Sequence, residues 1–280
     1  MSARIVSFGI GLLFAAGPAL AGDVATRTIS HDAVTLRVLD QGHGPCVMMI
    51  PSLGRGAGDF DDLAGRVAAA GYRVLRLQPR GIGGSTGPMS GLAMRDLASD
   101  VAHAITGSGE HACVVLGHAD GNRVARATAA YFPDTVSAVI LLAAGGKVKP
   151  DTEAWTALRA VFDDKLSPAE HLKDVQTAFF APGNDPAVWR DGWYPQTAEM
   201  ERVAATVTPV DDWWTAGSAP VLVIQANQDR IAPPQNADLL KADIGARAEV
   251  VRIDGAGHAM LPEQPDAIAR AVIAYLQARK

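Results

Sequence analysis

One ten-residue stretch, from Val114 to Arg123, constrains the fold of this chain more than any other. Its sequence, VVLGHADGNR, begins as a continuous apolar run, which is typical of a buried strand, and changes after Gly117 to a pattern that is compatible with a helix. Glycines at 117 and 121 flank position 119, and because they lack a Cβ they permit the close backbone approach that a sharp turn requires. The stretch therefore predicts a strand, a tight turn and a helix.

The spacing of the two glycines is that of a nucleophile elbow, a strained turn that lifts one side chain above the edge of a sheet. The position that such a turn reserves for the nucleophile holds Ala119. A methyl group can neither attack a carbonyl carbon nor lose a proton, so the ordinary covalent mechanism has no nucleophile here. An ordinary helix start after a buried strand, with the glycines present for packing, is the alternative interpretation.

The amino-terminal residues have the pattern of a secretory signal peptide. Residues 1–21 contain a positive charge at Arg4, an apolar stretch over 5–16 and a small-x-small ending at Ala21. The apolar stretch is short for a membrane span, although an amino-terminal membrane anchor is the alternative. We expect a mature chain that begins near Gly22, that is periplasmic or secreted, and that is not stably inserted in a membrane.

Composition narrows the class of protein further. The chain has 280 residues, of which 48% are hydrophobic, enough to bury the core of one large domain with an insertion. The net charge of -5, or -6 once Arg4 is removed, comes from scattered residues of both signs, so a nucleic acid is not expected as a partner. The two cysteines, Cys46 and Cys113, lie early in apolar runs. An oxidising compartment permits a disulfide, but thiols inside strands are more often buried and free, which is our prediction.

The remaining chain alternates predicted strands and helices. The first two strands, 26–30 and 34–39, alternate apolar and polar residues around a short turn and predict an antiparallel edge hairpin. Single amphipathic helices separate most of the later strands, which requires parallel crossovers and helices on both faces of one sheet. These later strands are predicted at 46–50, 72–77, 112–117, 136–143, 220–225 and 248–253.

Residues 147–217 interrupt this alternation, because they contain no strand-like run and hold all five tryptophans. We interpret the segment as a helical insertion that divides the core into residues 22–146 and 218–280. Its aromatic side chains either pack with one another or line the roof of a pocket. The tryptophans that we expect in the pocket are Trp155, Trp193 and Trp214.

Side chains that act on ligands gather beyond the carboxyl ends of the strands of a parallel sheet. Ala119 follows the central strand, Asp229 follows a later strand, and His258 follows the last one, so all three are expected at one edge. Asp229 can accept a hydrogen bond from one ring nitrogen of His258 and fix its tautomer. The other nitrogen then faces the turn as a general base.

At these residues the chain resembles the α/β-hydrolase superfamily, over nearly all of the expected mature length. The resemblance implies a mostly parallel eight-stranded sheet, a helical cap over 147–217 and an oxyanion hole formed by the backbone N–H groups of Leu53 and Asp120. Two positions depart from the family pattern. Pro51-Ser52 stands where many members have His-Gly, and Ala119 stands where they have Ser, Cys or Asp. The matching segments are the turn 117–121, the glycine-rich loop 78–85, the Asp229 loop and the motif 255–258.

Three explanations for Ala119 remain open. The serine of an ordinary hydrolase could have been replaced by alanine, or the chain could be a ligand-binding homologue without catalysis. The third is an enzyme that keeps the His258–Asp229 pair and finds its nucleophile or acid in Asp120 or, more weakly, Ser52. We favour the enzyme, because a histidine base beside an oxyanion hole can activate a water or a carbon acid without a covalent step. We expect a small apolar or aromatic ester, lactone or carbonyl substrate, and no metal or cofactor.

Overall fold

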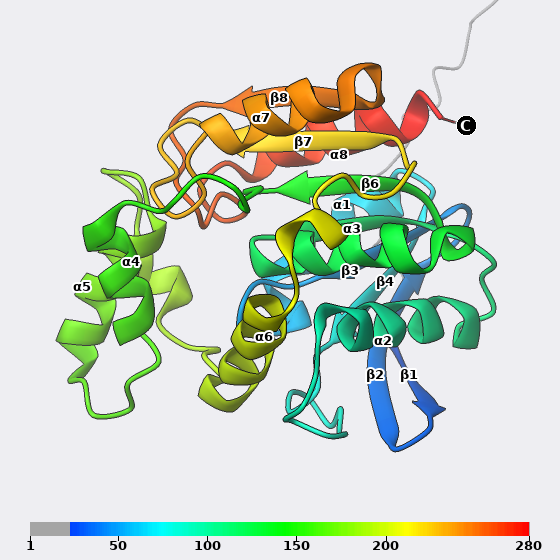
Figure 1. Cartoon of the computed structure of the whole chain (residues 1–280), viewed down its shortest axis with the longest axis horizontal. Helices are drawn as coiled ribbons and strands as arrows, with labels where there is room; N and C mark the ends of the chain where they lie inside the picture. The colour runs from blue at the N-terminus through cyan, green and yellow to red at the C-terminus, as the bar shows by residue number, and fades with distance from the viewer. Residues whose placement is uncertain (1–22, 280) are drawn as a thin grey trace, which may run out of the picture.

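A computed structural model describes residues 23–279, so the predicted signal peptide at 1–21 lies outside the described residues. The described chain is built on an eight-stranded sheet with the strand order β1-β2-β4-β3-β5-β6-β7-β8 (Figure 1). The first two strand pairs, β1–β2 and β2–β4, are antiparallel, and all the other pairs are parallel. The strands are β1 (Ala25–His31), β2 (Val34–Gly42), β3 (Cys46–Ile50), β4 (Arg73–Gln78), β5 (Cys113–His118), β6 (Val136–Leu142), β7 (Val221–Ala226) and β8 (Ala248–Ile253).

Helices cover both faces of this sheet, as the alternation of strands and helices predicts. One buried cluster joins the sheet to α2, α3 and α7, and a second joins its other face to α1 and α8. The α-helices are α1 (Asp61–Ala69), α2 (Met94–Gly107), α3 (Asp120–Tyr131), α4 (Thr152–Ala160), α5 (Pro168–Phe179), α6 (Pro195–Val207), α7 (Gln235–Ile244) and α8 (Pro265–Gln277). Short 3-10 helices lie at Ala57–Phe60, Pro133–Thr135, Pro186–Trp189, Val210–Asp212 and Gly245–Arg247.

The chain between β6 and β7 forms α4, α5 and α6. Figure 1 shows α4 and α5 beyond the carboxyl ends of β6 and β8. These two helices pack on each other around a small apolar cluster that includes Leu158, Val175 and Phe179 and extends to Trp189 and Ala259. Helices α4 and α5 therefore lie at the edge of the sheet at which the sequence places the candidate site.

The two cysteines form a disulfide between Cys46 and Cys113, which corrects the prediction of free thiols. Each is the first residue of its strand, and β3 and β5 are neighbours in the sheet with Val47 paired to Val114. Their Cα atoms are therefore 4.7 Å apart, within the range that a disulfide spans. The strand order decides this proximity, and the two apolar runs do not show it.

Within residues 23–279, none of the helices combines the length and the apolar character that crossing a bilayer would require.

Candidate active site

The strand–turn–helix around Ala119 has the conformation that its sequence predicts. Ala119 lies between β5 and α3 with φ 53° and ψ −111°, a backbone conformation that costs a residue with a Cβ about 1–3 kcal/mol. A Cβ on Gly117 would lie 2.1 Å from the carbonyl oxygen of Gly121, and one on Gly121 would lie 2.3 Å from that of Ile50. Both positions therefore require glycine, and the chain keeps a strained turn although its apex carries only a methyl group.

His258 and Asp229 form the predicted pair. Nδ1 of His258 lies 2.9 Å from Oδ2 and 3.0 Å from Oδ1 of Asp229, and both side chains are buried. Oδ1 also accepts the backbone N–H groups of Ile231 and Ala232, at 2.9 and 2.7 Å. These bonds fix the carboxylate, which in turn requires a proton on Nδ1 of His258. Nε2 is thereby left as the basic atom of the ring.

A cavity of about 210 Å³ adjoins this pair and the turn. The structure brings together Ser52, Leu53, Ala119, Asp120 and His258, which all line this cavity. Asp229 lies one layer behind His258. The remaining wall is largely apolar and includes Leu158, Phe162, Phe179 and Ile231.

Two backbone N–H groups beside the cavity have no acceptor. They belong to Leu53 and Asp120, and across residues 23–279 neither donates a hydrogen bond. The first lies in the loop after β3, and the second is the first N–H of α3, where helical geometry leaves donors unsatisfied. A negatively charged oxygen near Ala119 would meet two available donors.

Only one of the three expected pocket tryptophans lines the cavity. Trp155 of α4 does so and is 41% exposed. Trp214 is 1% exposed and belongs to the main core, where its Nε1 donates to Asp243 at 2.7 Å. Trp193 does not line the cavity and contacts Phe162 and Phe179, with ring centroids 5.5 and 5.3 Å apart. The expectation fails for Trp193 and Trp214 because packing occupies their rings.

Asp120, the first residue of α3, lies beside Ala119 with its carboxyl group almost fully buried. Oδ1 lies 3.5 Å from Nη1 of Arg123, and Oδ2 has no hydrogen-bond partner. Burial raises the pKa of Asp120, and the charges of Arg123 and Arg126 only partly oppose this shift. The residue therefore brings to the cavity a carboxyl group that takes up a proton more readily than an exposed aspartate.

His118, which the sequence analysis did not single out, connects the turn to the base. It is fully buried at the end of β5, and its Nε2–H donates to the backbone carbonyl of His258 at 2.8 Å. Burial, and next the proximity of His258, lowers the pKa of His118 to about 3, so the ring is neutral. Its position directly before Ala119 was the available signal, but the hydrogen bond depends on how the last loop docks.

Glu201 of α6 is a second residue that the sequence analysis missed. Its Oε2 accepts the backbone N–H of Gly54 at 2.7 Å, so it holds the loop that carries Leu53. Burial and the nearby charge of Asp120 raise the pKa of Glu201 well above its usual value. No local signal points to this residue, because its partner lies 147 positions away in the sequence.

Comparison with known proteins agrees with this fold. A family model described as serine aminopeptidase, S33, matches residues 43–265. A non-heme chloroperoxidase of Streptomyces lividans is 28% identical over 241 residues, covering 79% of this chain and 87% of that protein. A 2-(acetamidomethylene)succinate hydrolase of Mesorhizobium japonicum is 22% identical over 285 residues, covering 92% and 99%. A solved hydrolase from Pseudomonas aeruginosa, 22% identical, has a TM-score of 0.76 and covers 91% of this chain and 99% of its own.

Proposed function

This chain belongs to the family described as serine aminopeptidase, S33, which has the α/β-hydrolase fold, and we propose that it is an enzyme that acts on a small ester, lactone or related carbonyl compound by general base catalysis. The observation that carries this proposal is the His258–Asp229 pair beside the cavity that Ala119 lines. A base, a cavity and free N–H donors are present together, and a covalent nucleophile at the apex of the turn is not. Relatives that are named hydrolases support the reaction class.

In the proposed reaction His258 activates a water molecule. Nε2 takes a proton from the water as its oxygen bonds to the carbonyl carbon, and the carbonyl oxygen becomes an anion that the N–H groups of Leu53 and Asp120 stabilise. Asp229 stabilises the imidazolium that forms. The tetrahedral anion then collapses, the bond to the leaving alkoxide breaks, and His258 returns its proton to that oxygen. The methyl group of Ala119 leaves space for the water where a nucleophilic oxygen would otherwise lie.

Asp120 has a second role in this proposal, as a group that exchanges protons. Its raised pKa and its unpartnered Oδ2 suit a neutral carboxyl group that donates to a developing oxyanion or leaving group. The same features make it a weak nucleophile, because a nucleophile needs the ionised form. Ser52 is buried beside the oxyanion loop and lines the cavity, and it remains the secondary candidate for covalent attack.

We also propose that the mature chain is periplasmic or secreted. The disulfide between Cys46 and Cys113 supports this proposal, because such bonds persist in oxidising compartments and are rare in the cytosol.

The proposal is tested first by turnover. After a screen of short esters, lactones and β-diketones has identified a substrate, His258→Ala should lower kcat by roughly two to four orders of magnitude, the contribution of a positioned general base. Thermal unfolding of the variant checks that the fold is retained. Unchanged turnover in a folded His258→Ala protein would reject the proposed mechanism.

Covalent labelling tests the geometry of the turn independently of any substrate. A fluorophosphonate probe should not label the chain, whereas Ala119→Ser should be labelled at position 119, because the variant places a hydroxyl group beside the His258 base. The double change Ala119→Ser with His258→Ala is the matched control and should not react. Labelling of the unchanged chain at Ser52 would make that residue the nucleophile.

A ligand-binding protein without catalysis is the second candidate, and Ala119 is the observation that favours it. Two results together would support binding over catalysis. The substrate screen would find no turnover, and a ligand would raise the melting temperature of the unchanged chain but not of variants in the cavity residues.

A further inference from the structure

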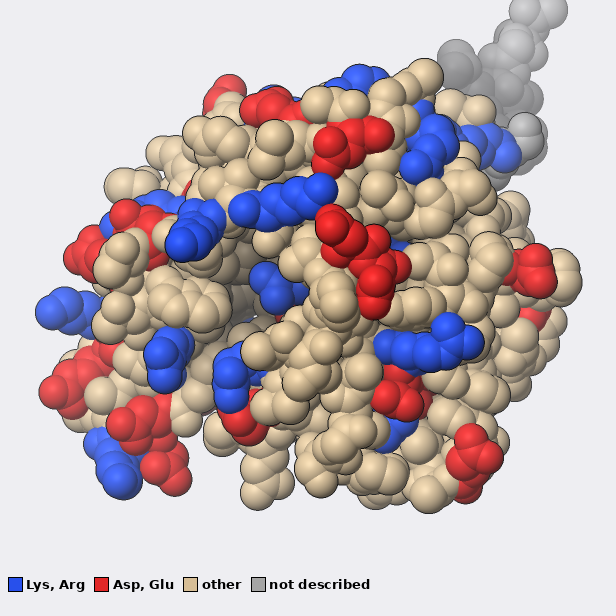
Figure 2. All heavy atoms as spheres, in the orientation of Figure 1, with Lys and Arg blue, Asp and Glu red and all other residues tan. Residues whose placement is uncertain are grey.

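The cavity beside Ala119 has a cationic mouth. The only acidic side chain that lines it among the described residues is Asp120, whereas four basic ones do. Figure 2 shows lysine and arginine side chains around the hollow on this face of the molecule. The four basic residues are Arg123, Lys147, Lys149 and Arg202.

Two of these four cations are already paired with acids outside the cavity lining. Nζ of Lys147 lies 3.2 Å from Asp243, and Arg202 donates two hydrogen bonds to Glu199 at 2.6 and 2.8 Å. The charges of Lys147 and Arg202 are therefore largely compensated by Asp243 and Glu199.

The other two cations have no such partner. Lys149 is exposed and forms no hydrogen bond or ion pair through its side chain anywhere in residues 23–279. Arg123 is half-buried and its guanidinium donates no hydrogen bond within that range, and its nearest acid is Asp120 at 3.5 Å. A guanidinium group stays charged at all ordinary pH values and offers a fork of N–H donors that matches a carboxylate. Arg123 and Lys149 are therefore the two lining cations whose side chains donate no hydrogen bond within the described residues.

The shape of the cavity limits what such an anion can be attached to. Its volume of about 210 Å³ limits the ligand to a small molecule. Leu158, Phe179 and Ile231 contribute an apolar lining to the same cavity. The lining therefore suits a ligand that combines a carbonyl group, a short aliphatic part and an anionic group.

The charge state of Asp120 favours such a ligand. Burial raises the pKa of Asp120, so this carboxyl group repels an incoming anion less than an ordinary aspartate would. The positive charge of Arg123 is correspondingly less neutralised.

We propose that the substrate is a short carboxylate-bearing ester, whose carboxylate binds to Arg123 and Lys149 while its ester carbonyl lies beside Ala119. This inference rests on the proposed function and narrows the expected apolar or aromatic substrate to an anionic one. Two cations at the mouth also accelerate the encounter with an anion, an effect that salt weakens.

A pair of esters that differ only in charge tests the inference. Monomethyl glutarate carries a carboxylate, and methyl 4-carbamoylbutanoate carries a neutral amide at the same position. We expect the unchanged chain to have a kcat/KM at least about tenfold higher for the anion, because a charge-assisted contact of this kind contributes more than a neutral one. Arg123→Gln should reduce the ratio of the two kcat/KM values by about tenfold, and Lys149→Gln by a smaller factor.

The matched control is Lys165→Gln, which removes an exposed lysine that does not line the cavity, and it should leave the ratio unchanged. A ratio near one in the unchanged chain, or a ratio that Arg123→Gln does not alter, would overturn the inference. Lys149→Gln keeps the test valid if Arg123→Gln fails to fold, since Lys149 is exposed and makes no contact that folding requires.

Calorimetric titration with glutarate separates this inference from the proposed function. Binding of glutarate that Arg123→Gln weakens at least about tenfold, without hydrolysis of either ester, would retain the anion subsite and reject the catalytic proposal. Hydrolysis of both esters at equal kcat/KM, without glutarate binding, would retain the catalytic proposal and reject the anion subsite.

Discussion

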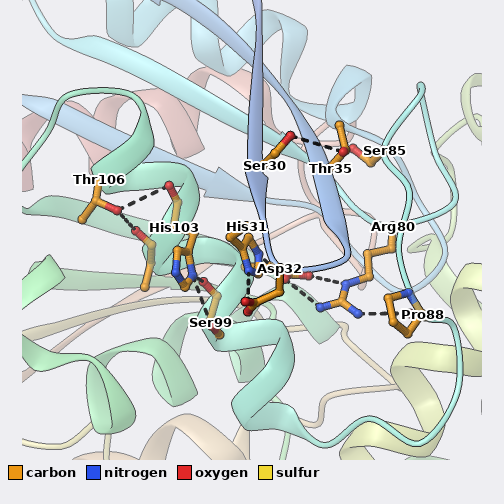
Figure 3. Close-up of polar contacts among 12 residues, drawn as sticks. Ser30, His31, Asp32, Thr35, Arg80, Ser85, Pro88, Ser99, His103 and Thr106 are labelled. Carbon is orange, nitrogen blue, oxygen red and sulfur yellow. Dashed lines mark hydrogen bonds and ion pairs between the residues drawn. The ribbon is translucent and has the colours of Figure 1, made fainter.

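Two histidine–aspartate hydrogen bonds of similar length lie in different surroundings within residues 23–279. His258 lies 2.9 Å from Asp229 at the carboxyl ends of the strands, and His31 lies 3.1 Å from Asp100 where β1 meets α2. Figure 3 shows His31 of the second pair together with Arg80, which donates to the carboxylate of Asp100.

The two carboxylates differ in what compensates their charge. Arg80 donates two hydrogen bonds to Asp100, at 2.7 and 2.8 Å, and both side chains are buried. Asp229 accepts backbone N–H groups, and among the described residues it has no arginine or lysine partner. Its charge remains available for an imidazolium that forms during a reaction.

The two imidazole rings also differ in what they face. The ring of His31 stacks on that of His103, with centroids 4.0 Å apart and an angle of 7° between the planes, and it does not line the cavity at the turn. The ring of His258 lines that cavity. A histidine–aspartate contact is therefore not sufficient for catalysis. An uncompensated carboxylate and access to a ligand are what distinguish the catalytic candidate.

The largest effect is expected from exchanging the two aspartates for asparagine. Asp229→Asn should lower kcat/KM by roughly two to four orders of magnitude with little change in stability, because Asn neither fixes the base tautomer nor stabilises its charged form. Asp100→Asn should leave kcat/KM nearly unchanged and destabilise the fold by about 3–5 kcal/mol, since the buried guanidinium of Arg80 loses its counter-charge. Kinetics and urea unfolding of both variants measure this. A comparable loss of turnover in a folded Asp100→Asn protein would contradict the comparison.

A third histidine, His118, sharpens the comparison through acid stability. Its pKa is lowered from 6.5 to about 3, so the unfolded chain binds a proton that the folded chain does not bind. Stability from this group is complete above pH 6.5 and decreases as the pH falls, by roughly 4 kcal/mol at pH 3. His118→Gln keeps an N–H donor toward His258 and should flatten the stability profile between these pH values. His43→Gln, at an exposed position, is the control. If the stability of His118→Gln varies with pH in parallel with that of the unchanged chain, His118 is protonated in the fold.

The smallest effect concerns Asp120. Among the described residues, its carboxyl group accepts no hydrogen bond from an arginine, as that of Asp100 does, and none from backbone N–H groups, as that of Asp229 does. Because its pKa is raised in the fold, its favourable contribution to stability is present below pH 3.8 and is lost as the pH rises through the folded pKa. Asp120→Asn removes the group whose ionisation the fold opposes, so we expect the variant to be about 1 kcal/mol more stable at pH 8, with a melting temperature roughly 3 °C higher. The difference should shrink at pH 4. Asp134→Asn, at an exposed position, is the control and should change neither the stability nor the melting temperature. A lower stability of Asp120→Asn at pH 8 would mean that the charges of Arg123 and Arg126 compensate the carboxylate.

Local patterns in the sequence were enough to place the strands, the turn and the histidine–aspartate pair. The run from Cys46 to Ile50 matches β3 residue for residue, because a strand buried on both faces leaves a continuous apolar signal. Gly117 and Gly121 were a reliable signal for the turn, because the space that a Cβ would need at each position is filled by backbone. At Gly117 that backbone belongs to Gly121, and at Gly121 it belongs to Ile50 at the end of the adjacent strand. Asp229 and His258 could be brought together because parallel strands carry their following loops to the same edge of the sheet.

Contacts between distant segments were decided only by the tertiary structure. The Cys46–Cys113 disulfide depends on which strands are neighbours. The support of Gly54 by Glu201 depends on how α6 docks against the sheet. The same holds for Trp214, whose apolar ring was equally compatible with a pocket and with the core that it occupies. Periodicity and spacing report on the environment of a residue along its own element, whereas the identity of its partner is set by how separate elements pack.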